Sequence, residues 1–195
     1  MRSMVSARRS LDIMTAEWSN RGLNLWTIEQ GSIPLIAGTA SYTLPADTID
    51  LIEHTLRTGS GTSQTDFSID RLGVSGYVDI VSKNQQGRPI QIYVTRTATP
   101  SIQVWPVPSD NTYTLIYWRM RRIQDSGAAT NTIDIPSRFI PPLVAGLAYY
   151  IAMKKPALMD RVPFLKSIYD EQFQLAQDED RERVSLRLVP YSGLT

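Results

Sequence analysis

The residues best suited to acid–base chemistry gather at 47–54, where the chain carries Asp47, Asp50, Glu53 and His54. Two carboxylates held a short distance apart can act as acid and base across a sugar, which is the chemistry of a cell-wall hydrolase. Aspartates are also typical of turns and strand starts. The structural interpretation of Asp47 and Asp50 is therefore the favoured one.

His54 is the single histidine, and the chain contains no cysteine. It could serve as a catalytic base or a metal ligand. A zinc site, however, would need carboxylates for all its other ligands, which is uncommon. A strand histidine beside a polar neighbour is the simpler interpretation, and we expect no metal and no cofactor.

Established catalytic motifs are missing from the sequence. It contains no G-x-S-x-G elbow, phosphate-binding loop, dinucleotide fingerprint or H-E-x-x-H helix, and Gly73-Val-Ser-Gly76 is too short for any of them. We therefore expect a protein that is not an enzyme.

A basic and aromatic cluster, Trp118-Arg-Met-Arg-Arg122, could contact nucleic acid, because arginine binds phosphate and aromatic rings stack on bases. Strand alternation would place Arg119 and Arg121 on one face and Arg122 on the other. The solvated end of a strand is the favoured interpretation. The alternative is that these three arginines face a DNA channel.

Charge and hydropathy exclude several classes of protein. The net charge is +1, and acidic and basic residues are balanced in the first 30 residues, the middle and the last 59. A nucleic-acid reader usually concentrates its basic residues on one element. No stretch approaches the about 18 apolar residues of a membrane helix, and the N-terminus has no apolar signal region. We expect a soluble protein with no membrane partner.

The chain should begin with a helix. Met4, Ala7, Leu11, Met14 and Trp18 recur with the three- and four-residue spacing of one helix face. Asn20-Arg21-Gly22 predicts its end, because glycine readily adopts the left-handed conformation that closes a helix. Trp18, Gly22 and Trp26 are the predicted structural corner, at which the chain turns toward strands.

The middle of the chain reads as β structure. Alternating apolar residues predict strands at 41–44, 48–57, 90–95, 102–104 and 112–123, and turn residues separate them. A short helix is expected within 68–85. In the 112–123 strand, Ile116, Trp118 and Met120 should face one way and Tyr113, Leu115 and Tyr117 the other. Residues 58–65 have the composition of a loop tip.

The last third is predicted to be helical. A broad apolar face follows Ser137, a candidate N-cap, and Pro141-Pro142 fits only the first turn. A second helix should run from 156 to 183, with residues 178–183 solvated on all sides. The remaining apolar residues have no helical periodicity, and such tails either fray or order on a partner.

These elements predict an α+β protein. Residues 1–31 and 137–183 would form a helical bundle, 32–136 an inserted antiparallel β module, and 184–195 an extended C-terminal arm.

The order of these pieces resembles the head-to-tail adaptors of tailed bacteriophages, in particular the tail tubular protein A, or gatekeeper-type, adaptors of short-tailed phages. The resemblance covers nearly the whole chain. It rests on the opening helix with Trp18 and Gly22, the Leu25-Trp26 and Ile28–Gly31 segment, Tyr42-Thr-Leu-Pro45, Val104–Pro108 before Tyr113–Tyr117, and the closing helix pair.

The resemblance implies a virion structural protein, assembled in the host cytoplasm, that forms a homo-oligomeric ring, a 12-mer, and completes the DNA exit channel. Its partners would be the portal protein and the next tail component, a nozzle or tail tube protein, and genomic DNA would pass through without sequence recognition. Loops near 58–66 and 106–111 would face the tail. The portal-binding arm would use Arg183, Arg187, Leu188, Val189, Tyr191 and Leu194.

Two other functions stay open from the residues alone. One is a virion-associated cell-wall hydrolase that uses Asp47, Asp50 or Glu53. The other is a carbohydrate-binding β module with Trp105 or Trp118 as its platform.

Overall fold

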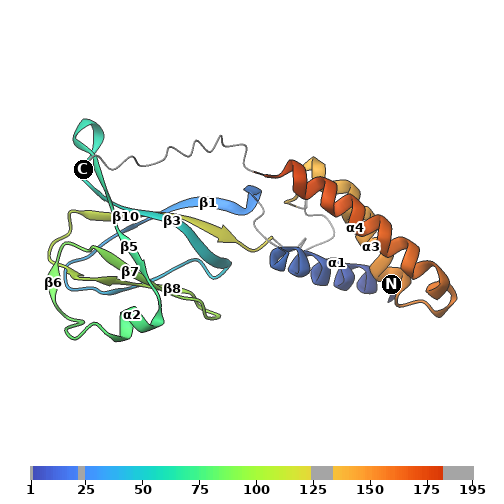
Figure 1. Cartoon of the computed structure of the whole chain (residues 1–195), viewed down its shortest axis with the longest axis horizontal. Helices are drawn as coiled ribbons and strands as arrows, with labels where there is room; N and C mark the ends of the chain where they lie inside the picture. Colours follow the sequence, from blue (N-terminus) through green and yellow to red (C-terminus); the bar gives the residue numbers. More distant parts are fainter. Residues whose placement is uncertain (1, 22–24, 124–133, 182–195) are drawn as a thin grey trace, which may run out of the picture. The chain divides into compact units, whose positions relative to one another are not determined.

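The computed structural model describes residues 2–21, 25–123 and 134–181. The chain divides into two compact units, a helical unit of Met1–Met14 with Ile135–Thr195 and a β unit of Thr15–Asp134. Figure 1 shows the helices and strands of both units. The predicted α+β class is confirmed, since the chain contains both helices and sheets. None of the helices in the described ranges is long and apolar enough to cross a bilayer.

The β unit is built from two four-stranded sheets. The first has the order β1-β10-β3-β4, with β1 at Ile28–Pro34, β10 at Tyr113–Arg121, β3 at Thr48–Thr58 and β4 at Thr65–Ser68. The second has the order β2-β8-β7-β5, with β2 at Ser41–Thr43, β8 at Ser101–Trp105, β7 at Gln91–Thr95 and β5 at Asp70–Leu72. All neighbouring strands are antiparallel except the parallel pair β5 and β7. A two-stranded parallel sheet joins β6 (Gln86–Gly87) to β9 (Val107–Pro108).

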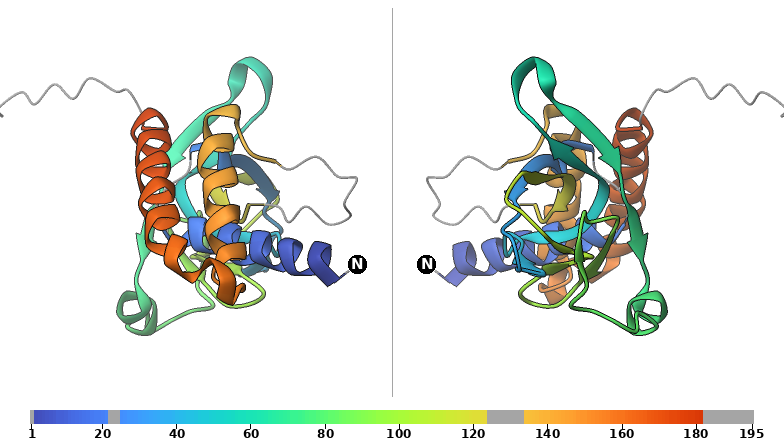
Figure 2. Two further views of the ribbon diagram at one scale, coloured as in Figure 1. Left: turned by 90° about the vertical axis from the view of Figure 1, so that its right-hand side faces the viewer. Right: turned by 90° about the vertical axis from the view of Figure 1, so that its left-hand side faces the viewer.

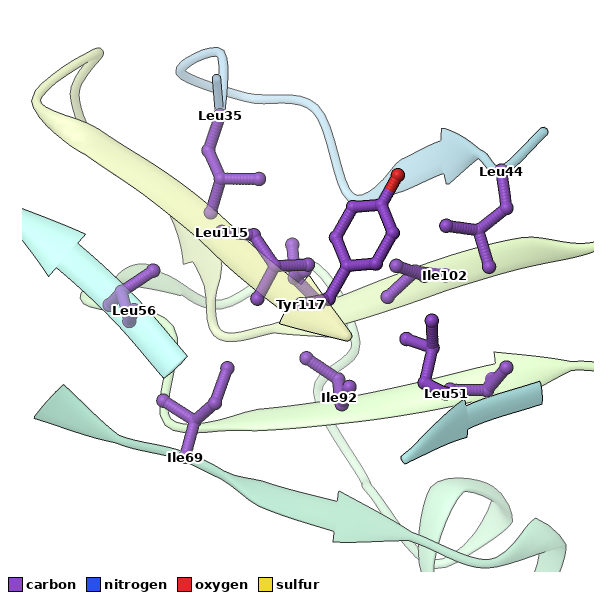
Figure 3. Close-up of a cluster of buried hydrophobic side chains, with 11 residues drawn as sticks. Leu35, Leu44, Leu51, Leu56, Ile69, Ile92, Ile102, Leu115 and Tyr117 are labelled. Carbon is purple, nitrogen blue, oxygen red and sulfur yellow. The ribbon is translucent and has the colours of Figure 1, made fainter. Parts of the chain in front are cut away.

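The core of the β unit lies between the two larger sheets. The first sheet contributes Leu51, Leu56, Leu115 and Tyr117, and the second contributes Ile92, Val94, Ile102 and Val104. In Figure 3 the labelled side chains of both sheets converge with Leu35, Leu44 and Ile69. The alternation predicted for 112–123 is confirmed on this face, because Leu115 and Tyr117 are buried in the core and Tyr113 packs against it.

The Tyr42-Thr-Leu-Pro45 motif has a structural role. The Tyr42 hydroxyl accepts a hydrogen bond from the Ile36 N–H at 2.9 Å and donates to the Thr39 carbonyl at 2.9 Å. Leu44 enters the core. The motif thereby ties the turn after β1 to the start of the second sheet.

The helical unit contains the first part of α1 (Arg2–Asn20), together with α3 (Ile140–Ala152) and α4 (Val162–Glu179). Short 3-10 turns, η3 (Ser137–Phe139) and η4 (Pro156–Arg161), precede α3 and α4. Helices α3 and α4 lie side by side (Figure 2). The packing is close at Gly146 on α3, where an added Cβ would lie 2.4 Å from the sulfur of Met14 on α1 and 2.7 Å from the ring of Tyr169 on α4. Tyr169 also stacks on Tyr149, with ring centroids 6.2 Å apart.

Most predicted elements are present, with four kinds of difference. The first concerns the strands: β1, β4, β5, β6 and β9 were not predicted, and the pairs β5–β7 and β6–β9 are parallel, whereas an antiparallel module was expected. Ile28–Pro34 pairs along its length with β10, so the β unit begins well before residue 32. The second is α2 (Val74–Val78), the short helix expected within 68–85, which is shorter than the apolar pattern suggested.

The other two differences concern the C-terminal helices. Ser137 is not an N-cap, because Pro136 holds that position for η3 and α3 begins after Phe139 without a side-chain cap. Prolines in the first turn of α3 remove donors that a cap would satisfy. Within 178–183, which was expected to be solvated on all sides, Asp180 is buried and forms an ion pair with Arg138.

The pairing of β1 with β10 depends on Gly31. It lies opposite Tyr117, and an added Cβ would be 2.4 Å from the Tyr117 ring. We expect Gly31→Ala to lower the free energy of unfolding by about 1–3 kcal/mol, because Tyr117 must leave its place in the core. Urea unfolding measures this change. Gly76→Ala is the matched control, since its Cβ would meet Leu72 only at 3.4 Å; equal losses in both variants would contradict the close-approach explanation.

Candidate functional site

Two buried arginines on β10 are held by carboxylates from three segments. Arg119 donates to Asp47 Oδ1 at 2.6 Å and to Glu29 Oε2 at 2.9 Å. Arg121 pairs with Glu29 and Asp134. Both arginines are less than one tenth exposed. We name these five residues the arginine–carboxylate cluster.

The cluster favours the charged forms of Asp47, Arg119 and Arg121. The hydrogen bond from Arg119 lowers the pKa of the Asp47 carboxyl below its usual range. Burial acts to lower the pKa of the Arg119 and Arg121 guanidiniums, yet their carboxylate partners outweigh burial and raise it. Both guanidiniums are thus buried and neutralised by Glu29, Asp47 and Asp134 within the chain. The channel-facing role of Arg119 and Arg121 stays a prediction.

Arg122 is placed differently. It is exposed, and no ion pair of its guanidinium occurs among the residues that the structure describes. Together with Arg96 it lines an open hollow of about 420 Å³, whose other walls are Ala46, Thr48, Ile49, Thr97 and Ala98. Of the three predicted channel-facing arginines, Arg122 alone presents its charge to solvent.

Asp50 is a bridging carboxylate rather than an acid–base catalyst. It accepts from Arg71 at 2.6 Å and from Arg96 at 2.8 Å. Burial acts to raise the pKa of Asp50, but these two hydrogen bonds outweigh burial and lower it. Asp47 and Asp50 are therefore both ionised at neutral pH, and neither is suited to donate a proton as a glycosidase acid must. Glu53 is exposed.

His54 lies on β3 opposite Tyr117. Burial lowers the pKa of its imidazole, although the nearby Ile69 backbone favours the charged form to a smaller degree. Neither ring nitrogen has a partner at hydrogen-bonding geometry in the described ranges. In that part of the chain no three histidine, aspartate or glutamate residues are grouped so that they could hold a metal ion.

The aromatic residues considered as a glycan platform are only partly exposed. Trp105 donates its indole N–H to the Ser82 carbonyl at 2.9 Å, and Trp118 lies in the middle of β10, half-buried. Of the predicted corner, Trp18 is fully buried and Trp26 is half-buried in η1 (Leu25–Thr27), while Gly22 lies outside the described residues.

Of the two loops expected to face the tail, 58–66 is largely exposed. In 106–111, however, residues 106–108 are buried, with 107–108 paired as β9. Ser109 and Asn111 are exposed and Asp110 is half-buried, and Asn111 accepts a hydrogen bond from the Ala37 N–H at 2.7 Å. The six residues of the predicted portal-binding arm, Arg183, Arg187, Leu188, Val189, Tyr191 and Leu194, lie outside the described residues.

A family model, described as SU10 adaptor protein, matches residues 7–190. This match spans both units and nearly the whole chain. The chain belongs to the SU10 adaptor protein family. Membership indicates a bacteriophage adaptor, a structural component of the virion that acts at the junction of head and tail. A search of curated proteins found no match.

Sequence reasoning missed Glu29 and Asp134 as partners of the arginines. Glu29 lies on β1, whose polar sequence did not indicate a strand. Asp134 lies thirteen residues further along the chain than Arg121, to which it binds. The excess of basic residues at 119–122 was the one available signal, because buried arginines require acidic partners. In this SU10-family adaptor the acidic partners lie in other segments of the chain, and no local sequence pattern links them to the arginines.

Glu29 is the carboxylate shared by both arginines, so its loss should be costly. We expect Glu29→Gln to lower the free energy of unfolding by about 1–3 kcal/mol, because a buried guanidinium loses charged partners. Urea unfolding at neutral pH tests this. Glu53→Gln, an exposed residue on β3, is the control and should change stability by less than about 0.5 kcal/mol. A silent Glu29→Gln would show that the cluster does not stabilise the β unit.

His54 should make stability depend on pH. Its pKa in the folded chain lies below the usual 6.5, so the unfolded chain binds a proton first as pH falls. The free energy of unfolding should be constant above the usual pKa of 6.5. It should decrease as the pH falls below that value, until the folded form also binds the proton. Unfolding from about pH 7.5 to about pH 5 avoids the aspartates, which titrate lower. His54→Leu should flatten the profile, and an unchanged slope would assign the dependence to other groups.

Proposed function

We propose that this chain is a head-to-tail adaptor that forms a ring of twelve copies between the portal protein and the next tail component, a nozzle or tail tube protein. The ring completes the channel through which genomic DNA leaves the head. The chain acts in the virion after assembly in the host cytoplasm. The observation that carries the proposal is the family match over residues 7–190, which includes both the helical and the β unit.

Within this proposal the units divide the work. The helical unit forms the ring, the β unit faces the tail, and residues 184–195 bind the portal. The apolar residues of that segment follow a charged helix end, and a segment of this composition gains apolar burial only on a partner. Ordering on the portal would make docking conditional on a completed head.

The exposed basic residues of the β unit suit passage of DNA without sequence recognition. Arg122 and Arg96 share one open hollow, and Asp50 neutralises Arg96 only in part because it also binds Arg71. Arginines of this kind attract phosphate by charge alone. The channel-facing role is accordingly assigned to Arg122 rather than to Arg119 or Arg121.

Removal of residues 184–195 should abolish portal binding and leave the fold intact. Light scattering of the adaptor mixed with portal measures the complex, and circular dichroism with urea unfolding measures the fold. Because a deletion removes polar residues too, Leu188→Ser with Tyr191→Ser is the sharper variant. Ser185→Ala with Ser192→Ala is its matched control and should bind as the original chain does. Portal binding that survives the deletion would refute the arm.

A further inference from the structure

An open groove lies along α1 in the helical unit. Its volume is about 570 Å³, and Val5, Ser6, Arg9, Ile13 and Lys154 line it. Val5 is 69% and Ile13 is 47% exposed. Arg9 lies between them, four residues from each, so all three follow one side of the helix.

Lys154 lines this groove and is hydrogen-bonded to α1. Its ammonium donates to the Ser6 carbonyl at 3.2 Å and to the Ser10 hydroxyl at 2.7 Å. These bonds attach the end of α3 to α1, so the groove is formed by packed elements of one unit. The groove is therefore apolar at Val5 and Ile13 and positive at Arg9 and Lys154.

A second surface of the same unit, on α4, has the opposite charge. On α4, Phe164 is 67% and Leu175 is 59% exposed. They are separated by about three helical turns and so share a face. Glu171 is exposed and lies between them on that face, four residues before Leu175. We name Phe164, Glu171 and Leu175 the outer face of α4.

The central charge of each surface has no partner within the described ranges, where neither Arg9 nor Glu171 forms an ion pair. The neighbouring charges of α4 are already satisfied. Lys166 pairs with Asp170, and Arg181 pairs with Asp178. Each surface thus presents a charge without an ion pair in the described ranges that is flanked by two exposed apolar residues: Arg9, with Lys154 beside it, in the α1 groove, and Glu171 on α4.

We infer that the α1 groove binds the outer face of α4 from a second copy of this chain. Arg9 would meet Glu171, while Val5 and Ile13 would cover Leu175 and Phe164. The two surfaces consist of different residues of one unit, so the contact is heterologous and repeats from copy to copy. Such a contact closes into a ring when the rotation between copies allows it. The inference rests on the proposed ring and supplies its subunit contact.

Charge reversal tests the pairing. Arg9→Glu and Glu171→Arg should each weaken self-association of the full chain by at least about tenfold, because like charges then face each other. An equimolar mixture of the two variants, and the double variant alone, should recover association. Sedimentation equilibrium measures these affinities. Arg8→Glu, one residue outside the groove lining, is the matched control and should behave as the original chain.

Cross-linking tests the direction of the contact. Because the chain has no cysteine, Ile13→Cys and Leu175→Cys introduce unique thiols that a short bis-maleimide can join. Cross-linked dimers should form in a mixture of the two variants and not within either variant alone. Dimers within one variant alone would indicate a twofold contact and overturn the inference.

The remaining outcomes separate the inference from the proposed function. Normal self-association in both charge-reversal variants would refute this contact while leaving the adaptor ring standing. A chain that stays monomeric at high concentration and also with portal would refute the ring and the contact together. If portal binding by residues 184–195 persists in that chain, docking stands while the ring and the self-contact both fail.

Discussion

The β unit depends on the ion pairs that two buried guanidiniums form with carboxylates. Arg119 and Arg121 lie on β10, the strand between β1 and β3. Burying an arginine without a partner would cost several kcal/mol. The requirement is met by Glu29 on β1, by Asp47 before β3, and by Asp134 at the end of the unit. The ion pairs therefore fix the edge strand, the entry to β3 and the point at which the chain leaves the β unit.

This constraint also explains which features could be predicted from the sequence. Strands with apolar alternation, such as β7, β8 and β10, follow from the period of two, and the helices follow from periodic apolar faces and prolines in the first turn. β1 was not predicted, because several of its side chains are polar and its stability comes from pairing with β10 and from the ion pairs of Glu29. Those partners are about 90 residues away along the chain, and no local pattern reports so distant a contact.

The candidate site shows the same limit. The arginines at 119–122 were conspicuous, but the sequence could not distinguish guanidiniums neutralised inside the protein from one exposed to solvent. Strand alternation correctly separated Arg122 from the other two, yet the outcome depended on acids contributed by other segments. Asp50 was equally ambiguous until Arg71 and Arg96 were found to bind it.

The distribution of satisfied and unsatisfied charge points to where assembly takes place. Inside the β unit, acids and arginines are matched within the chain, so this unit needs no partner to compensate its buried charge. On the helices of the SU10-family adaptor, Arg9 and Glu171 each lie between exposed apolar side chains with no ion pair in the described ranges. A monomer gains nothing from such an arrangement, since exposed apolar area and a solvated charge contribute little to folding. Both features become favourable when another surface removes the apolar area from water and supplies the opposite charge. The helical unit is thus the part of this chain whose surface chemistry is incomplete without a neighbour.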